Sequence, residues 1–275
     1  RKIMEIKAAD VAKLRAMTGA GMMDCKKALV EAEGDFDRAQ DIIREKGKLV
    51  AAKRADRTAT QGVVASKIVG QKGYMLCLAC ETDFVAQNAD FVAATNAILD
   101  IAVEADAADL DALLAVVKDG KTVAEIVTEK SGQTGEKVEL AYYGKIEAPM
   151  CVTYIHMNSK LGTLIGFNKE IDKEVAKDVA MQAAAMAPVS IDKGDCDPKI
   201  IEHERMIGRE QARQEGKPEA MLDKIAEGKV NKFLKENTLL NQDLVKNNKI
   251  SVGTYIKEAD KDATVIAYKR FSLND

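Results

Sequence analysis

The segment VVASKIVGQKGYMLCLA (Val63–Ala79) contains two strand-like runs on either side of a turn. The first run, VVASKIV, leads into GQKG (Gly70–Gly73), which has the composition of a tight turn. The second run, YMLCLA (Tyr74–Ala79), is apolar throughout, which is typical of a central strand. A helical pattern follows, with Phe91, Ala94, Ile98 and Ala102 on one face. The segment therefore predicts a β-hairpin followed by a helix.

The same pattern recurs in the middle of the chain. The predicted strands are CVTYIHM (Cys151–Met157) and TLIGF (Thr163–Phe167), with the turn NSKLG between them. A second helix follows, with Val175, Val179 and Ala183 on one face. We interpret this recurrence as an internal duplication of a strand–turn–strand–helix unit.

The two copies differ in the connection from the second strand to the helix. The first copy uses ETDFVAQN (residues 81–88), whereas the second uses the shorter NKEID (residues 168–172) and no aromatic residue. The repeated architecture therefore does not require Phe84. Two interpretations stay open: Phe84 or Val85 folds back on the following helix as a hydrophobic staple, or Phe84 is an exposed anchor, with Asp83 beside it, that inserts into another protein.

The first fifty residues predict three short helices with a small core. Val11, Leu14 and Met17 have helical spacing, and the pattern is interrupted at Thr18–Gly21. A second helix is expected to stop near Gly34 and a third to start at the cap Asp35 and end near Gly47. The apolar residues of these two helices are Met22, Met23, Ala28, Leu29, Phe36, Ala39, Ile42 and Ile43. The two methionines have two open interpretations: they pack in the helical core, or an exposed turn presents them to a partner.

The rest of the chain is predicted to be mostly helical. Two short helices are expected in residues 110–120 and 121–132. After Pro188, two polar helices begin near Pro198 and Pro218 and are joined by a tight turn at Gly216, which suggests a projecting antiparallel hairpin. Its narrow apolar seam fits coiled-coil pairing, within the chain or with a second copy. A helix in ISVGTYIKEA and a strand in ATVIAYKRFSL complete the predicted α+β fold.

Composition limits the possible functions. The 275 residues carry a net charge of −3, aromatic residues make up 4%, and Trp is absent. Binding along a phosphate backbone needs a basic surface and base stacking needs aromatic faces, so no direct nucleic-acid binding is expected. No apolar run approaches the length of a membrane span, and five scattered cysteines are typical of a reducing cytoplasm.

The beginning of the chain lacks the apolar segment of a secretion signal. Whether Met4 is the natural first residue, with Arg1–Ile3 left from an added segment, stays open. Together with the composition, the lack of a signal-like apolar segment predicts a cytoplasmic protein.

Several short motifs resemble chemical sites but do not have the required context. AVVKDGKT (Ala115–Thr122) resembles a phosphate-binding loop, but we expect Ala115–Lys118 to continue a helix that ends at Gly120, and Thr122 to cap the next helix with Glu125. Cys77 and Cys80 lie on a predicted strand, where residues three apart face opposite sides. His156 and His203 are not near a nucleophile motif. The sequence thus predicts no catalytic, metal or cofactor site.

Two segments, VAKLRAMTGAGMMDCKKALVEAEGDFDRA and ETDFVAQNADF, resemble the bacterial elongation factor Ts family, and the resemblance continues through SVGTYIKEA and VIAYKRF. It implies a guanine-nucleotide exchange factor for the translational GTPase elongation factor Tu. The implied fold is a three-helix domain like ubiquitin-associated domains in residues 1–55, then two related α/β subdomains in residues 56–144 and 145–275. A coiled-coil hairpin is inserted at about residues 190–237.

The resemblance also implies which residues bind elongation factor Tu. Asp83 and Phe84 would wedge between two helices of the GTPase domain, near its magnesium and phosphate site. The other implied contacts are Thr82, Val85, Leu14, Arg15, Gly21, Met22, Met23, Thr134 and Gly135, the last two within the stretch Thr134–Glu136. The second subdomain would touch a distal domain of the GTPase. Some members continue into a further C-terminal helical module, so that contact is not expected for a chain ending at Asp275.

Two other functions remain as alternatives at this point. The first is an adaptor, in which the three-helix domain recruits a partner without any exchange activity. The second is a phosphate-loop enzyme that uses Lys121. The elongated connection at residues 81–88 favours the exchange factor over the adaptor, and the expected capping at Thr122 argues against the enzyme. A homodimer through the helical hairpin also stays open.

Overall fold

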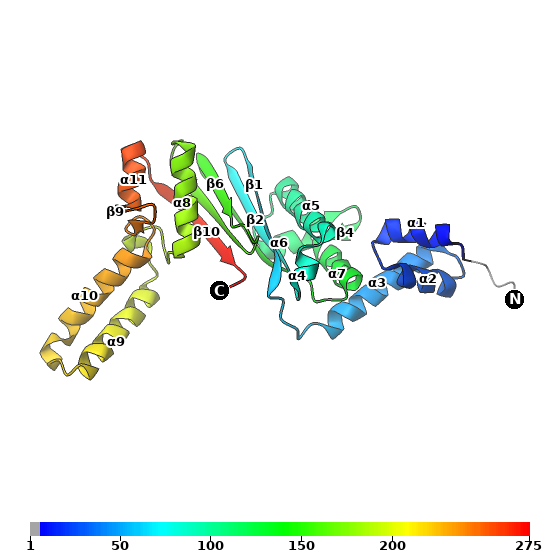
Figure 1. Cartoon of the computed structure of the whole chain (residues 1–275), viewed down its shortest axis with the longest axis horizontal. Helices are drawn as coiled ribbons and strands as arrows, with labels where there is room; N and C mark the ends of the chain where they lie inside the picture. Colours follow the sequence, from blue (N-terminus) through cyan, green and yellow to red (C-terminus); the bar gives the residue numbers. More distant parts are fainter. Residues whose placement is uncertain (1–5) are drawn as a thin grey trace. The chain divides into compact units, whose positions relative to one another are not determined.

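A computed structural model describes residues 6–275, so Met4 and the three residues before it lie outside the described part (Figure 1). The chain forms two compact units. Unit 1 contains the residues up to Ala65, Leu76–Tyr143 and Leu273–Asp275, and unit 2 contains Ser66–Met75 and Gly144–Ser272. The fold is α+β, as predicted, while the predicted domain boundaries at residues 55 and 144 stay predictions.

Unit 1 begins with a small helical domain, which we call the head. Within the described residues it consists of α1 (Ala8–Thr18), α2 (Met22–Glu31) and α3 (Phe36–Lys53), as the apolar spacing predicts. Asp35 caps α3 by accepting hydrogen bonds from the amides of Asp37 and Arg38. The side chains of Leu14, Cys25, Leu29 and Ala39 form the buried core of the head.

Helix α3 continues well beyond its predicted end. We expected it to stop near Gly47, but it runs on to Lys53. Gly47 is buried where α3 packs on α7 (Val123–Thr134), next to Gly132. A glycine at a close helix contact is explained by packing and need not end the helix.

The sheet that begins in unit 1 has the strand order β1-β2-β5, with bounds Gln61–Val69, Lys72–Cys80 and Glu139–Glu147. The central position of β2 is confirmed, and its residues from Met75 to Cys80 are completely buried. Strand β5 was missing from our sequence prediction. Helices α4 (Asp83–Ala86), α5 (Ala89–Ala105) and α6 (Leu110–Ala115) connect β2 to the rest of the unit.

The segment after α6 differs from the prediction. We expected Ala115–Lys118 to continue a helix, but the helix ends at Ala115 and two short strands follow, β3 (Val117–Lys118) and β4 (Lys121–Thr122). Asp119 and Gly120 both have positive φ, at 51° and 79°, and form the turn between the strands. The predicted capping box of Thr122 and Glu125 is present at the start of α7.

Unit 2 contains the second copy of the repeated pattern. Strands β6 (Met150–Ile155), β7 (Leu161–Phe167) and β10 (Val265–Ser272) form an antiparallel sheet with β7 in the centre, where Ile165 pairs with Val152 and Tyr268. Helices α8 (Lys173–Met186) and α11 (Val252–Ala259) pack on it, with the short strands β8 (Asp243–Leu244) and β9 (Asn247–Ser251) nearby. Both sheets thus have the same strand order. Each contains a hairpin, β1–β2 or β6–β7, and a later strand, β5 or β10, lies beside the second strand of that hairpin, which supports the duplication.

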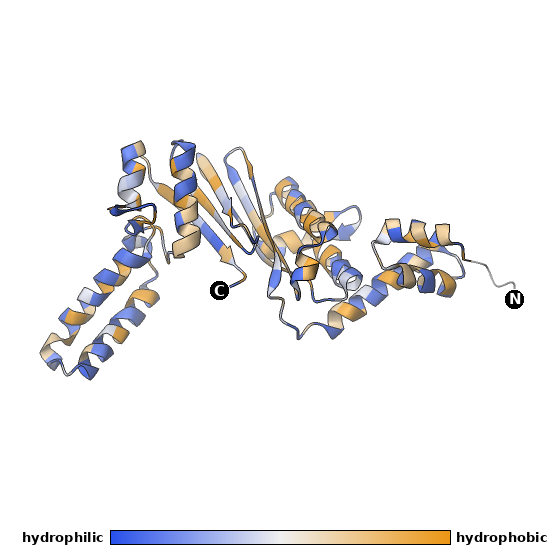
Figure 2. Cartoon of the chain, viewed as in Figure 1, coloured by the Kyte–Doolittle hydropathy of each residue, from blue (hydrophilic) through white to orange (hydrophobic). Residues whose placement is uncertain are grey.

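A helical hairpin extends between α8 and β8. Its helices are α9 (Pro198–Gln214), which Asp197 caps as predicted, and α10 (Glu219–Asn237). Ala212, Leu222, Ala226 and Val230 are buried, and hydrophilic and hydrophobic residues alternate along both helices (Figure 2). Three ion pairs cross between the helices in antiparallel order: Arg205 with Glu227, Arg209 with Asp223, and Arg213 with Glu219. Coiled-coil geometry and pairing with a second copy stay predictions.

The buried thiols of β2 give a testable pH dependence. Burial raises the pKa of Cys77 and the pKa of Cys80 from 9.0 to about 12. Both thiols therefore stay protonated in the folded chain at pH values where the unfolded chain releases their protons, so stability is lost as pH rises from 9 to 12. We expect the free energy of unfolding of the wild type, measured by urea denaturation, to fall more steeply over this range than that of Cys77→Ala/Cys80→Ala. Parallel pH curves would contradict the prediction.

Candidate functional site: a turn that exposes Phe84

The connection between β2 and α5 forms a short helical turn, residues 82–86, which we call the Phe84 turn. Thr82 is its N-cap and accepts a hydrogen bond from the amide of Val85 through Oγ1, at 3.4 Å. Ala86 points inward, whereas Asp83 is exposed and the Phe84 side chain is 85% exposed. The staple interpretation is therefore wrong for Phe84, and the exposed-anchor interpretation fits its position.

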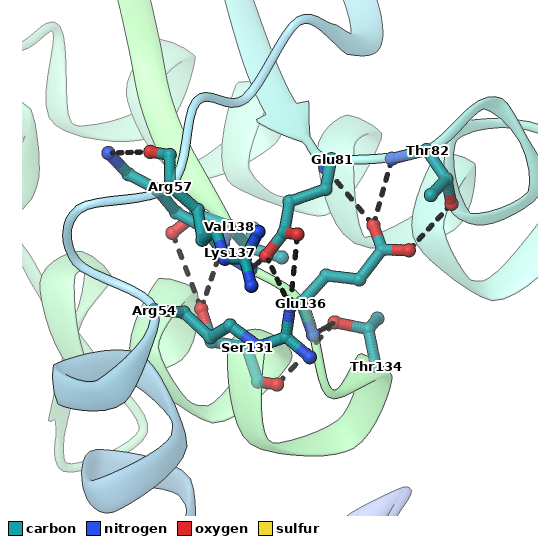
Figure 3. A network of polar contacts seen from close by, with 9 residues as sticks. All are labelled: Arg54, Arg57, Glu81, Thr82, Ser131, Thr134, Glu136, Lys137 and Val138. Atoms are coloured by element: carbon teal, nitrogen blue, oxygen red, sulfur yellow. Dashed lines mark hydrogen bonds and ion pairs between the residues drawn. The ribbon is translucent and has the colours of Figure 1, made fainter.

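The carboxylate of Glu136, which is distant in the sequence, accepts hydrogen bonds from the start of this turn. Glu136 accepts hydrogen bonds from the amides of Glu81 and Thr82, at 3.0 and 3.1 Å, and from the Thr82 hydroxyl, at 2.6 Å (Figure 3). Hydrogen bonds to an ionised acceptor are stronger than neutral ones. The backbone just before Phe84 is thus fixed by three donors to a single side chain.

A second carboxylate connects the same region to the segment that leaves the head. Glu81 accepts a hydrogen bond from the amide of Lys137 at 2.7 Å and pairs with Arg54 at 3.1 Å (Figure 3). The ammonium group of Lys137 donates to the carbonyl oxygens of Ala55 and Arg57. The start of the Phe84 turn, the loop after α7 and the segment after α3 therefore form one polar network.

The loop after α7 is itself ordered by local bonds. The hydroxyl of Ser131 accepts a hydrogen bond from the amide of Val138 at 3.0 Å, and both residues are buried. Gly135 ends the helix with a positive φ of 74°. The Thr134 hydroxyl donates to the carbonyl of Lys130 in its own helix. Thr134 and Gly135, which the resemblance implies as partner contacts, are half-buried here.

The thiol of Cys80 supports the turn and is not a reactive group. Its Sγ donates to the carbonyl of Thr82 at 3.2 Å, and the side chain is completely buried. A raised pKa of about 12, caused mainly by burial, keeps this thiol protonated and able to donate. Cys77 is also completely buried in β2, so both thiols fill space in the interior of unit 1.

The head presents most of its predicted contact residues to solvent. Met22 and Met23 are 44% and 63% exposed at the start of α2, and Arg15 and Gly21 are also exposed. This arrangement favours the exposed-turn interpretation of the two methionines. Leu14 requires a correction, because its side chain is completely buried in the head core and offers no surface to a partner.

A groove in unit 1 brings three predicted segments together. Its lining includes Arg15 and Met22 from the head, Val85 from the Phe84 turn, and Thr134 from α7. Helix α5 adds three alanines and Phe91, and burial lowers the pKa of Lys130, which also lines the groove. Residues that are far apart in the sequence thus line one groove, and Phe84 directly precedes its lining residue Val85 in the sequence.

The other motifs have structural roles in the described part of the chain. Lys121 donates to Glu129 at 2.8 Å and Thr122 caps α7, which is not the arrangement of a phosphate-binding loop. His156 Nδ1 lies 3.0 Å from the hydroxyl of Tyr154, and His203 is exposed on α9. Among residues 6–275, no cluster of three or more His, Cys, Asp or Glu side chains could hold a metal ion. No helix in this range is long and apolar enough to span a membrane.

Sequence reasoning did not find Glu136 as a supporting residue. The stretch Thr134–Glu136 was implied only as a contact region, and nothing in its local pattern indicates that the carboxylate faces inward to residues 81 and 82. The pairing is long-range, and glutamates are common in this sequence. A signal could have come from the strand-to-helix connection itself, whose amides at residues 81 and 82 need acceptors outside regular structure.

Comparisons with known proteins agree on one family. The sequence model described as "Elongation factor TS" matches residues 81–275. The chain is 46% identical over 272 residues to the elongation factor Ts of Porphyromonas gingivalis strain ATCC 33277, covering 98% of this chain and 99% of the relative. It is 49% identical over 275 residues to that of Cytophaga hutchinsonii and 47% over 273 residues to that of Christiangramia forsetii, with the same coverage.

The support of the Phe84 turn can be tested by changing Thr82. Replacing Thr82 with Val keeps the size of the side chain but removes both the cap of Val85 and the hydroxyl donor to Glu136. We expect Thr82→Val to lower the free energy of unfolding by about 0.5–2 kcal/mol, the usual range for a lost cap. Thr82→Ser keeps the hydroxyl and is the matched control. Equal stability of the two variants in urea denaturation would show that the hydroxyl contributes nothing.

Proposed function

The chain belongs to the elongation factor Ts family, and from this membership we propose that it binds the translational GTPase elongation factor Tu and accelerates the release of its bound GDP. The exposed ring of Phe84 on a well-supported turn is the observation that carries the mechanism. A large apolar side chain in water is available for burial in a partner, and full burial of a Phe stabilises a complex by about 1.5–3 kcal/mol.

The position of the ring is as important as its exposure. Because Glu136 fixes the backbone of Glu81 and Thr82, little conformational entropy remains to be lost at this turn when the ring enters a pocket. Rigid aromatic anchors in the centre of an interface contribute most of its binding energy. We propose that Asp83 and Phe84 enter together between two helices of the GTPase domain.

Exchange follows from differential binding, without a covalent change by this chain. A factor that binds the nucleotide-free GTPase better than the GDP-bound form weakens GDP binding by the same ratio by which GDP weakens binding of the factor. A difference of about 4 kcal/mol corresponds to roughly a thousandfold change in affinity. Fresh nucleotide then displaces the factor by the same coupling.

The carboxylate of Asp83 adds an electrostatic contribution. It is exposed beside Phe84, so insertion of the ring carries a negative charge into the partner. Near a site that holds magnesium and phosphate, this charge would repel the nucleotide phosphates and disturb the coordination of the metal. The metal and nucleotide belong to the partner, and this chain needs no cofactor of its own in the proposal.

Further contacts come from the head and from unit 2. Arg15, Gly21, Met22 and Met23 offer an exposed and adaptable surface for the same GTPase domain, and Leu14 supports it from within the head core. The half-buried Thr134 lines the groove, and the half-buried Gly135 follows it at the end of α7. We also propose that unit 2 contacts a distal domain of the GTPase and that the protein acts in the cytoplasm. Dimerisation through the helical hairpin belongs to the same proposal.

Replacement of Phe84 tests the proposed function. We expect Phe84→Ala to slow the catalysed release of a fluorescent GDP from elongation factor Tu by at least about tenfold, which corresponds to 1.4 kcal/mol of lost anchor energy. The fold should stay intact because the ring is 85% exposed. Substoichiometric wild-type protein should accelerate release, measured by stopped-flow fluorescence.

Val117→Ala is the matched control, because Val117 is 63% exposed on β3, outside the predicted contact segments. Its rate should equal that of the wild type. A wild-type rate for Phe84→Ala would remove the ring from the mechanism. Binding of elongation factor Tu without any acceleration by the wild type would instead support the adaptor.

A further inference from the structure

The end of α7 contacts both the head and the Phe84 turn, and we propose that it is a positioning element that presents them to the partner as one rigid surface. We define the α7 end as residues 132–136, all within unit 1. Gly132 and Gln133 contact the head, and Glu136 binds the backbone just before Phe84. The inference rests on the proposed function, in which both surfaces bind one GTPase domain.

The head is attached to the α7 end by close packing and one strong polar contact. A methyl group at Gly132 would lie 2.5 Å from the Cα of Gly47, so α3 and α7 touch at a distance that only glycine permits. The amide Nε2 of Gln133 donates to the carbonyl of Thr18 at 2.6 Å, just before the loop that leads to Met22. Gly19 lies directly on the Gln133 side chain.

Ion pairs between the head and α7 add little to this attachment. Arg44 lies 3.6 Å from Glu129, and Glu129 is shared with Lys121. Both Arg44 and Glu129 are partly solvated, and solvated pairs of this kind contribute little net stability. The glycine contact and the bond from Gln133 to Thr18 therefore contribute more to this attachment than the ion pair does.

The other side of the α7 end fixes the Phe84 turn. Glu136 lies three residues after Gln133, and its carboxylate binds the amides of Glu81 and Thr82. The bond between buried Ser131 and Val138 closes the loop that carries Glu136. A shift of the α7 end would consequently move the attachment of the head and the support of Phe84 together.

Rigid spacing gives these two surfaces a functional advantage. Once one surface binds, the second binds as an intramolecular step with a high effective concentration, provided that the spacing matches the partner. A head on a loose tether would lose freedom on binding and contribute less. The methionines of the head therefore contribute fully only while the α7 end holds the head in place.

A matched pair of glycine variants tests the head side of the α7 end. Gly132→Ala must displace the head, because its methyl group meets backbone at 2.5 Å, whereas Gly47→Ala meets nothing closer than 3.7 Å. Both changes introduce the same methyl group in the same pair of packed helices. We expect faster amide hydrogen exchange at residues 18–24 in free Gly132→Ala and unchanged exchange there in Gly47→Ala. Equal exchange profiles of the two variants would overturn the inference.

The coupling to function is tested with the methionines of the head. In the wild type, Met22→Ala/Met23→Ala should raise the concentration of factor for half-maximal GDP release by about tenfold. In the Gly132→Ala background the same double change should have less than about a threefold effect, because the displaced head no longer binds with high effective concentration. The same fold-effect in both backgrounds would overturn the inference. If Gly132→Ala does not fold by circular dichroism, Gln133→Ala, which adds no volume, replaces it.

Glu136→Gln tests the other side. This change keeps the size of the side chain but removes the carboxylate that accepts the hydrogen bonds. Amide hydrogen exchange at Glu81 and Thr82 should therefore accelerate, and the maximal rate of GDP release should fall. Amide exchange at residues 18–24 should stay at its wild-type rate. Unchanged exchange at residues 81 and 82 would contradict the inference. If the wild type does not accelerate GDP release from elongation factor Tu, the proposed function is rejected. The amide hydrogen exchange measurements use the free chain, so they report on the α7 end independently of that result.

Discussion

The three hydrogen bonds that Glu136 accepts from residues 81 and 82 are the constraint on which the candidate site depends. An irregular connection between a buried strand and a helix leaves amides without partners, and unpaired amides are costly when water is excluded. A carboxylate can satisfy several such donors at once. Because these acceptor atoms come from a separate helix–loop segment, the geometry of the Phe84 turn depends on the tertiary fold as well as on its own cap at Thr82.

This constraint explains how the chain tolerates an aromatic ring in water. The ring of Phe84 gives up the stabilisation that burial would provide, and the turn could recover it by collapsing onto α5. Collapse would break the hydrogen bonds to Glu136 and the cap from Thr82. Met22 and Met23 of the head are exposed as well, and the head packs on α7 through Gly47 and Gly132. In both places exposed apolar side chains thus lie on backbone that polar bonds or close packing support.

The sequence predicted the elements that depend on local patterns and missed those that depend on distant contacts. The apolar run of β2, the cap at Asp35 and the capping box at Thr122 were all found, because each signal lies within a few residues. Strand β5 was missed, and the end of α3 was placed too early because Gly47 was interpreted as a stop signal. Within the site, the exposure of Phe84 was left open. Leu14 was named as a contact only from the resemblance, although its helical spacing from Val11 already indicated the apolar face that the head buries. Glu136 could not be found, as its partners lie more than fifty residues away in the sequence.

The duplication shows where such a site can arise in this fold. Both copies use the same order of strands, and the second copy connects β7 to α8 with a short polar segment that has no exposed ring. At this connection the two copies differ in length and chemistry, while the strand before it and the helix after it are of the same kind in both copies. The added residues need an acceptor for their amides, and the loop after α7 supplies it just before β5, the strand next to β2. An exposed aromatic turn is therefore compatible with this fold at the position where an elongated connection meets a neighbouring segment that accepts its hydrogen bonds.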